Sequence, residues 1–169
     1  MRYYVNNFLI YSFIGYIFES LLKTLFHNNM NNGFLYGPWI PIYGFGVCII
    51  IFIMKLIFNR FKTKRFIKIL LLFLISSITL TLLEFIGGSL IYILTKKTFW
   101  NYSKLRFNIG PFIALEISII WGIMSIIITN LIKPIIDKII KKIPSIITYL
   151  VLLIFLIDLI ITITRNLII

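Results

Sequence analysis

Residues 66–94 have the sequence FIKILLLFLISSITLTLLEFIGGSLIYIL, and within this apolar run only Lys68 and Glu84 carry charge. A helix needs about 20 mainly apolar residues to cross a bilayer, so this run is long enough to span a membrane with some tilt. Its length and apolar character predict a membrane helix rather than a helix of a soluble domain.

Four further segments have the same character, and the sequence therefore predicts an all-α, polytopic membrane helix bundle with about five transmembrane helices. The whole chain is 60% hydrophobic and 13% charged, with a mean hydropathy of +1.04, whereas about a quarter of the residues in a soluble domain are charged. Links are short, so residues 1–169 are expected to form a single integral membrane domain surrounded by lipids. The predicted spans are residues 3–26, 39–58, 66–94, 111–132 and 146–165.

The net charge of +12 is explained by membrane topology, because the lysines and arginines mostly flank the predicted spans. On one side, Arg2 and the basic residues of the links at 55–68 and 133–142 make eleven positive charges, whereas the opposite side has five. Basic residues gather on the cytoplasmic side of membrane proteins. We therefore expect the N-terminus inside and the C-terminus outside, and no nucleic-acid partner.

Four of the five acidic residues lie inside predicted spans, namely Glu19, Glu84, Glu116 and Asp158. A carboxylate in hydrocarbon costs roughly 3 kcal/mol or more unless it is paired, hydrated or protonated, so such residues usually face a bundle interior or a wet cavity. In the predicted orientation all four lie in the outer half of the membrane. They are expected to converge on one polar site open to the outside.

Three of the four carboxylates also have a structural explanation, whereas Glu116 has no cation within its own span and is the best single functional candidate. Lys23 lies one helical turn after Glu19, and Arg165 lies two turns after Asp158, so both acids have a cation available for a local ion pair. Glu84 precedes two glycines, which permit close helix packing around a hydrogen-bonded side chain. These alternatives assign the acids to the folding of the chain rather than to a ligand.

Two loops expected on the outer side combine aromatic residues with glycine and proline: NGFLYGPWIPIYGFG at 32–46 and FWNYSKLRFNIGP at 99–111. Tyrosine and tryptophan favour the membrane interface in any case. The density of glycine and proline, however, favours a shaped vestibule above the carboxylates. The candidate ligand-binding or translocation residues are Glu19, Glu84, Glu116, Tyr36, Trp39, Tyr43, Trp100, Tyr102 and Asn108.

The sequence offers little support for an enzyme. The single His27 and the single Cys48 provide no set of metal ligands, and no glycine-rich phosphate loop is present, so no metal or cofactor is expected and this chain should not itself hydrolyse ATP. Paired glutamates could perform acid–base chemistry, which leaves a membrane-embedded enzyme as a minor alternative. The link at 133–144, KPIIDKIIKKIP, is expected to form a short amphipathic helix on the cytoplasmic leaflet.

Several motifs in the same order resemble the bacterial permease family named "Putative ABC-transporter type IV". They are YSFIGYIFE at 11–19, GFLYGPWIPIYG at 33–44, LEF at 83–85, WNYS at 100–103, FNI at 107–109, LE at 115–116 and WG at 121–122. The resemblance covers about residues 11–134 and departs from the family at Tyr16, where a tryptophan is expected. It implies a multi-pass permease subunit of the bacterial cell membrane.

The resemblance also implies partners. A separate cytoplasmic ATPase would supply energy, and five spans are few for a pore, so a second copy or another membrane subunit is expected. Two main functions follow from the sequence. One is a permease-like subunit with an outer pocket for a cationic or proton-coupled solute, and the other is a non-transporting scaffold or lipid-interacting protein.

A topology reporter tests the predicted orientation. Alkaline phosphatase fused after Ile169 should be active and green fluorescent protein fused there should be dark, because the C-terminus is expected outside the cytoplasm. Insertion of the same reporters into the 61–64 link should give the opposite pair of signals. A cytoplasmic C-terminus would contradict the prediction.

Overall fold

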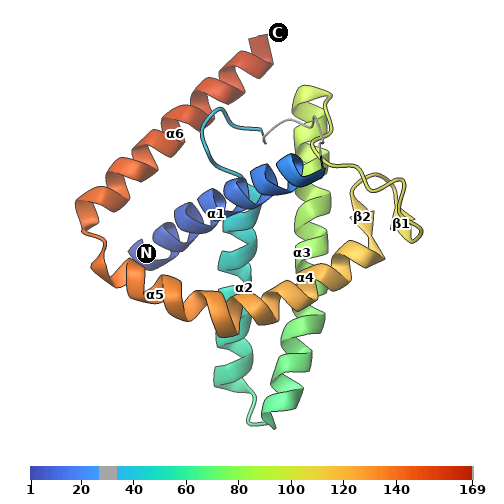
Figure 1. The fold of residues 1–169 in the computed structure, drawn as a ribbon, viewed down its shortest axis with the longest axis vertical. Coiled ribbons are helices and arrows are strands. Elements are labelled where there is room, and N and C mark those ends of the chain that lie inside the picture. Colours follow the sequence, from blue (N-terminus) through green and yellow to red (C-terminus); the bar gives the residue numbers. More distant parts are fainter. Residues whose placement is uncertain (27–33, 169) are drawn as a thin grey trace.

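The computed structural model describes residues 1–26 and 34–168, without the side chains of residues 22, 23, 26 and 166–168. The predicted all-α architecture is confirmed for this part of the chain (Figure 1). A two-stranded antiparallel hairpin precedes α4, and α4, η1 and α5 follow one another without a break. The elements are α1 (Arg2–Phe26), α2 (Pro41–Arg60), α3 (Arg65–Thr95), β1 (Asn108–Ile109), β2 (Ile113–Ala114), α4 (Leu115–Ile127), the π-helical turn η1 (Ile128–Ile132), α5 (Lys133–Lys142) and α6 (Ser145–Ile168).

Four described helical segments are long and apolar enough to cross a membrane: Pro41–Arg60, Arg65–Thr95, Leu115–Lys142 and Ser145–Arg165. The first predicted span corresponds to α1, a helix of 25 residues. Three of its polar side chains, those of Asn6, Asn7 and Ser12, are buried inside the protein. The Asn6 Oδ1 accepts a hydrogen bond of 2.8 Å from Thr148 Oγ1 of α6. The polar face of α1 therefore faces other helices.

The helix in the region of the fourth predicted span, 111–132, begins and ends elsewhere than the span does. Its first residues belong to the hairpin, in which Asn108 pairs with Ala114 around a turn at Gly110 with φ of +63°. At its other end the helix does not stop but continues through η1 into α5. Pro134 is tolerated there because it lies in the first turn of α5, directly after the wide π-helical turn.

The predicted amphipathic helix is present as α5, but it is continuous with the preceding span. Ile136 and Ile140 point into the main hydrophobic core, whereas Ile135 and Ile139 are exposed. The core draws on α1, α2, α3, η1 and α5. It consists of Tyr11, Val47, Ile50, Ile51, Leu80, Ile128, Ile136 and Ile140.

Close helix contacts are made possible by glycine. A side chain added to Gly44 of α2 would collide with Ser12 and with the backbone carbonyl of Phe8 in α1. By contrast, a Cβ at Gly87 of α3 would meet only the tip of Ile42, at an ordinary contact distance of 3.5 Å. Gly44 therefore sets the distance between α1 and α2, and Gly87 has no such role.

The loop before α2 is held between α1 and α6. Asp158 of α6 accepts hydrogen bonds from the backbone N–H groups of Tyr36 and Gly37, at 3.2 and 2.9 Å. On the other side, the Ile40 N–H donates to the Ser12 carbonyl at 3.0 Å. Asp158 thus anchors this loop, and the Arg165 guanidinium lies over the Tyr36 ring, 5.6 Å from its centroid.

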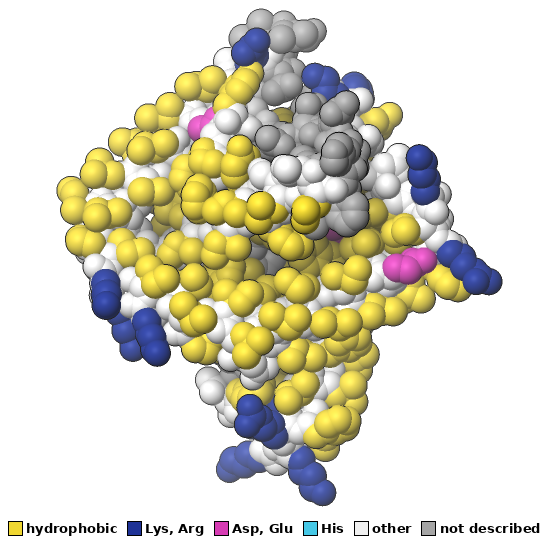
Figure 2. All heavy atoms as spheres, viewed as in Figure 1, with side chains coloured by type: hydrophobic (Ala, Val, Ile, Leu, Met, Phe, Trp, Pro, Cys, Tyr) yellow, Lys and Arg dark blue, Asp and Glu magenta, His cyan; other side chains and the backbone are white. Residues whose placement is uncertain are grey.

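Figure 2 shows broad hydrophobic surfaces on the flanks of the molecule, with lysine and arginine side chains gathered at its extremities. One such group surrounds the α2–α3 turn, and another lies where α5 meets α6. Arg2 donates a hydrogen bond of 2.6 Å to Ser145, which places the N-terminus beside the second group. This distribution agrees with a protein embedded in a bilayer, and which end faces the cytoplasm stays a prediction.

The glycine contacts give a matched pair of substitutions. Gly44→Ala should destabilise the protein by about 1–3 kcal/mol, because overpacking forces α1 and α2 apart. Gly87→Ala should be neutral or slightly stabilising, since alanine favours helices by about 1 kcal/mol over glycine. Thermal unfolding of both variants in detergent micelles measures the difference. Equal midpoints would contradict the role assigned to Gly44.

Candidate functional site

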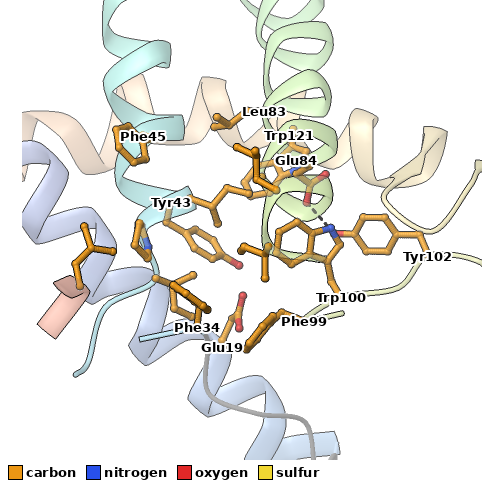
Figure 3. A pocket seen from close by; sticks show the side chains of 17 residues that line it. Glu19, Phe34, Tyr43, Phe45, Leu83, Glu84, Phe99, Trp100, Tyr102 and Trp121 are labelled. Atoms are coloured by element: carbon orange, nitrogen blue, oxygen red, sulfur yellow. Dashed lines mark hydrogen bonds between the residues drawn. The ribbon is translucent and has the colours of Figure 1, made fainter. Parts of the chain in front are cut away.

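A cavity of about 410 Å³ lies between α1, α2, α3 and α4, beneath the two loops predicted to form a vestibule. Figure 3 shows its two carboxylates, Glu19 from α1 and Glu84 from α3, on different sides of the cavity. Most of the remaining lining is aromatic or aliphatic. No lysine or arginine lines the cavity among the residues that the structure describes.

Glu84 is only 5% exposed and is held by a tyrosine from the second loop. The Tyr102 hydroxyl donates a hydrogen bond of 2.8 Å to Glu84 Oε1 (Figure 3). Burial, reinforced by the neighbouring Glu84 carboxylate, raises the pKa of Tyr102 above its ordinary range, so the hydroxyl stays protonated and remains a donor. The Tyr102 N–H donates to the Pro111 carbonyl at 2.8 Å, and this bond fixes the loop over the cavity.

Glu19 also faces a tyrosine. The hydroxyl of Tyr43, in the first turn of α2, and the Glu19 carboxylate point toward each other (Figure 3). Gly15 of α1 makes room for the Tyr43 ring, because a Cβ there would collide with it. The predicted partner of Glu19, Lys23, has a side chain outside the described residues.

Two tryptophans line the cavity. Trp100 packs edge-on against Phe112 with ring centroids 6.1 Å apart, and Trp121 packs edge-on against Tyr43 at 5.9 Å. The Nε1 atoms of both are buried, and neither forms a hydrogen bond of standard geometry within the described residues. Trp121 lies beside Glu84 and adds a favourable electrostatic contact.

The structure brings together five of the nine candidate residues. Glu19, Glu84, Tyr43, Trp100 and Tyr102 all line the cavity. The remaining four lie outside its lining, as does Asp158. The expectation that all the membrane carboxylates share one site is therefore corrected: two of them share it, and the other two hold loops.

Glu116 lies at the start of α4, where its Oε1 accepts a hydrogen bond of 3.2 Å from the Phe107 N–H. Its position in the first helical turn is favourable for a carboxylate, because the helix dipole places partial positive charge there. Glu116 Oε2 is buried without a hydrogen-bond partner among the described residues. The side chain closes the hairpin against α4 and does not reach the cavity.

Tyr36, Trp39 and Asn108 also lie outside the lining of the cavity. Tyr36 is 58% exposed. Trp39 packs against Phe155 of α6, at 6.0 Å between ring centroids, and Asn108 donates to the Gly110 carbonyl at 3.1 Å inside the hairpin. Their places near the cavity are taken by Phe34 and Phe99, one from each loop, whose rings meet edge-on at 6.1 Å.

Phe34, Phe99 and Trp121 were not among the predicted site residues, although all three lie in the loops and motifs quoted above. Phe34 and Phe99 carry no polar group that would distinguish them from the other aromatic residues of the two loops. His27 and the first residues of the 32–46 loop lie outside the described residues. Within those residues, no group of three or more histidine, cysteine or acidic side chains is placed to hold a metal ion.

Comparison with known proteins places the chain in a family. The model of the family described as "Putative ABC-transporter type IV" matches residues 6–163, a longer stretch than the motifs alone had indicated. No curated protein and no solved structure gave a match. Because the matched region covers nearly all of the 169 residues, the chain belongs to the "Putative ABC-transporter type IV" family.

Proposed function

We propose that this membrane protein is a permease-like subunit of an ABC-type transporter and that its cavity takes a positively charged solute. One observation carries the proposal. Glu19 and Glu84 come from separate helices, line the same cavity, and are surrounded by aromatic and aliphatic walls. A site with two carboxylates and no basic lining residue among those described favours a ligand that brings positive charge.

The environment strengthens this preference. Charges interact more strongly where water is excluded, so a cation between aromatic walls gains both ion pairing and cation–π attraction. Tyr102 holds the Glu84 carboxylate in place through its hydroxyl, and the Tyr43 hydroxyl points toward the Glu19 carboxylate. In the absence of a solute, protons can neutralise the same carboxylates, and this offers a route to proton-coupled movement.

The family relationship supports the partners in this proposal. The sequence contains no phosphate-binding loop, so ATP hydrolysis would belong to a separate cytoplasmic subunit. A second copy of the chain or another membrane subunit would complete a pore in the bacterial cell membrane. The chain acts here as a transporter component and not as an enzyme.

A non-transporting scaffold is the second candidate. The observation in its favour is that Glu116 and Asp158 each bind backbone N–H groups of loops and so serve the fold. If Glu19 and Glu84 did the same, their only task would be to order the helices through Tyr43 and Tyr102. Such a protein would present its apolar flanks to lipids or to other membrane proteins.

Two glutamine variants separate these candidates. Glu84→Gln keeps an oxygen for the Tyr102 hydroxyl but removes the charge, so uptake of a cationic solute should fall at least about tenfold. Glu116→Gln is the matched control, because it removes the same charge outside the cavity. Uptake of a panel of radiolabelled cations by membrane vesicles measures the effect. If Glu84→Gln lowers only the stability of the purified protein, the scaffold is favoured.

Co-purification tests the proposed partner. The full-length chain, isolated from native membranes in mild detergent, should bring with it a protein that hydrolyses ATP, and the ATPase activity of the complex should respond to the transported cation. Recovery of the chain as a homo-oligomer without ATPase activity would contradict the proposed assembly.

A further inference from the structure

We propose that Lys55 belongs to a binding site for the headgroup phosphate of an anionic phospholipid, where α1, α2 and α5 meet at the end of the molecule that carries the N-terminus. None of the residues that form this site lines the cavity. The inference therefore goes beyond the proposed function and does not depend on it.

Two tyrosines of α1 hold the Lys55 ammonium group. Lys55 Nζ lies 5.1 Å from the centroid of the Tyr3 ring and 5.0 Å from that of the Tyr4 ring, and it donates a hydrogen bond of 3.2 Å to the Tyr4 hydroxyl. Lys133 Nζ of α5 lies 5.9 Å from the same Tyr3 centroid. One aromatic ring thus serves two ammonium groups that come from different helices.

This cluster carries one positive charge more than it neutralises. Asp137 accepts hydrogen bonds from the Tyr3 hydroxyl at 2.9 Å and from Lys133 Nζ at 2.5 Å. Its contact with Lys133 is the one salt bridge among the described residues, so Lys55 has no carboxylate at that distance there.

The rest of this side of the protein does not supply the missing charge. Asp137 is the single acidic residue in the links at 55–68 and 133–142, which with Arg2 carry eleven positive charges. The negative charge that balances Lys55 is therefore expected to come from another molecule.

The site still has hydrogen-bond donors to offer. A lysine ammonium carries three N–H groups, and one of those of Lys55 is directed to Tyr4. Aromatic rings attract positive charge but accept hydrogen bonds poorly. Lys55 is exposed, and the Tyr4 hydroxyl keeps its own O–H to donate. These donors suit the oxygens of a phosphate group.

The surroundings of Lys55 favour a lipid as the source of the phosphate. Lys55 lies five residues before Arg60, the last residue of α2, or about 8 Å from the helix end. At that depth a lysine extends its ammonium group toward the interface, where tyrosine is also favoured. Phe52, one turn farther from the helix end, is 55% exposed and offers an apolar surface to an acyl chain. A phospholipid combines the anionic group with such chains.

Lipid binding to the purified full-length chain provides the test. The delipidated protein in detergent is titrated with phosphatidylglycerol or with phosphatidylcholine of the same acyl chains, and native mass spectrometry measures the dissociation constant of the first bound lipid. Both lipids contain the phosphate, but only phosphatidylglycerol has a net negative charge. It should bind at least about fivefold more tightly, which is the factor that one basic residue contributes near an anionic headgroup.

Variants locate the site. Lys55→Gln should weaken the first phosphatidylglycerol about fivefold, because it removes the charge but keeps a polar group for Tyr4. Lys55→Arg keeps the charge and should retain the preference. Lys62→Gln is the matched control, because it removes one exposed charge of the same side outside the cluster. Asp137→Asn should strengthen binding, since it frees Lys133 and still leaves an acceptor for the Tyr3 hydroxyl.

Equal weakening by Lys55→Gln and Lys62→Gln would mean a diffuse attraction and would overturn the site, as would equal binding of the two lipids. Displacement of phosphatidylglycerol by an equal concentration of glycerol 1-phosphate would identify a soluble phosphate as the ligand and overturn the lipid. In protein isolated from native membranes, Lys55→Gln should lose bound anionic lipid. Loss of an acidic protein in its place would also contradict the inference.

Discussion

The buried carboxylate of Glu84 is the constraint on which the arrangement around the cavity depends. A charged side chain in the apolar middle of a long helix needs a donor from elsewhere in the protein. Tyr102 supplies that donor, and to do so its loop must cross over α3 and be fixed to Pro111 by a backbone hydrogen bond. Gly88, one turn after Glu84 on α3, makes room for the Phe112 ring. Trp100 in turn packs edge-on against Phe112. One polar group thus organises a largely apolar region.

Hydropathy was sufficient to predict the helices because the bilayer requires long apolar segments with all backbone hydrogen bonds satisfied internally. Hydropathy did not show, however, that α1 buries the polar side chains of Asn6, Asn7 and Ser12 inside the protein, where Asn6 is bonded to Thr148 of α6. The hairpin at 108–114 and the π-helical turn were also missed, because each depends on backbone pairing or helix phase rather than on composition.

The cavity could be predicted only in part. Carboxylates inside spans were a reliable signal that polar sites exist, and Glu19, Glu84 and their tyrosines do come together. Which way each acid points was not available from the sequence. Glu116 has Phe107 nearby as a backbone donor, and Asp158 has Tyr36 and Gly37, all supplied by loops whose paths arise from tertiary packing. The position of an acid along its helix therefore indicates how deep in the membrane it is expected to lie, but not toward which neighbour its side chain points.

The π-helical turn at 128–132 affects parts of the molecule well beyond it. One additional residue in a helical turn rotates everything that follows by about 100°. That rotation determines which isoleucines of α5 enter the core and the direction in which α6 departs. Because α6 carries the aspartate that secures the 34–40 loop, and Phe34 and Ile40 of that loop line the cavity, the shape of the cavity is coupled mechanically to an irregular backbone segment in a different helix. A change of register at that segment would reach the cavity without altering any residue that lines it.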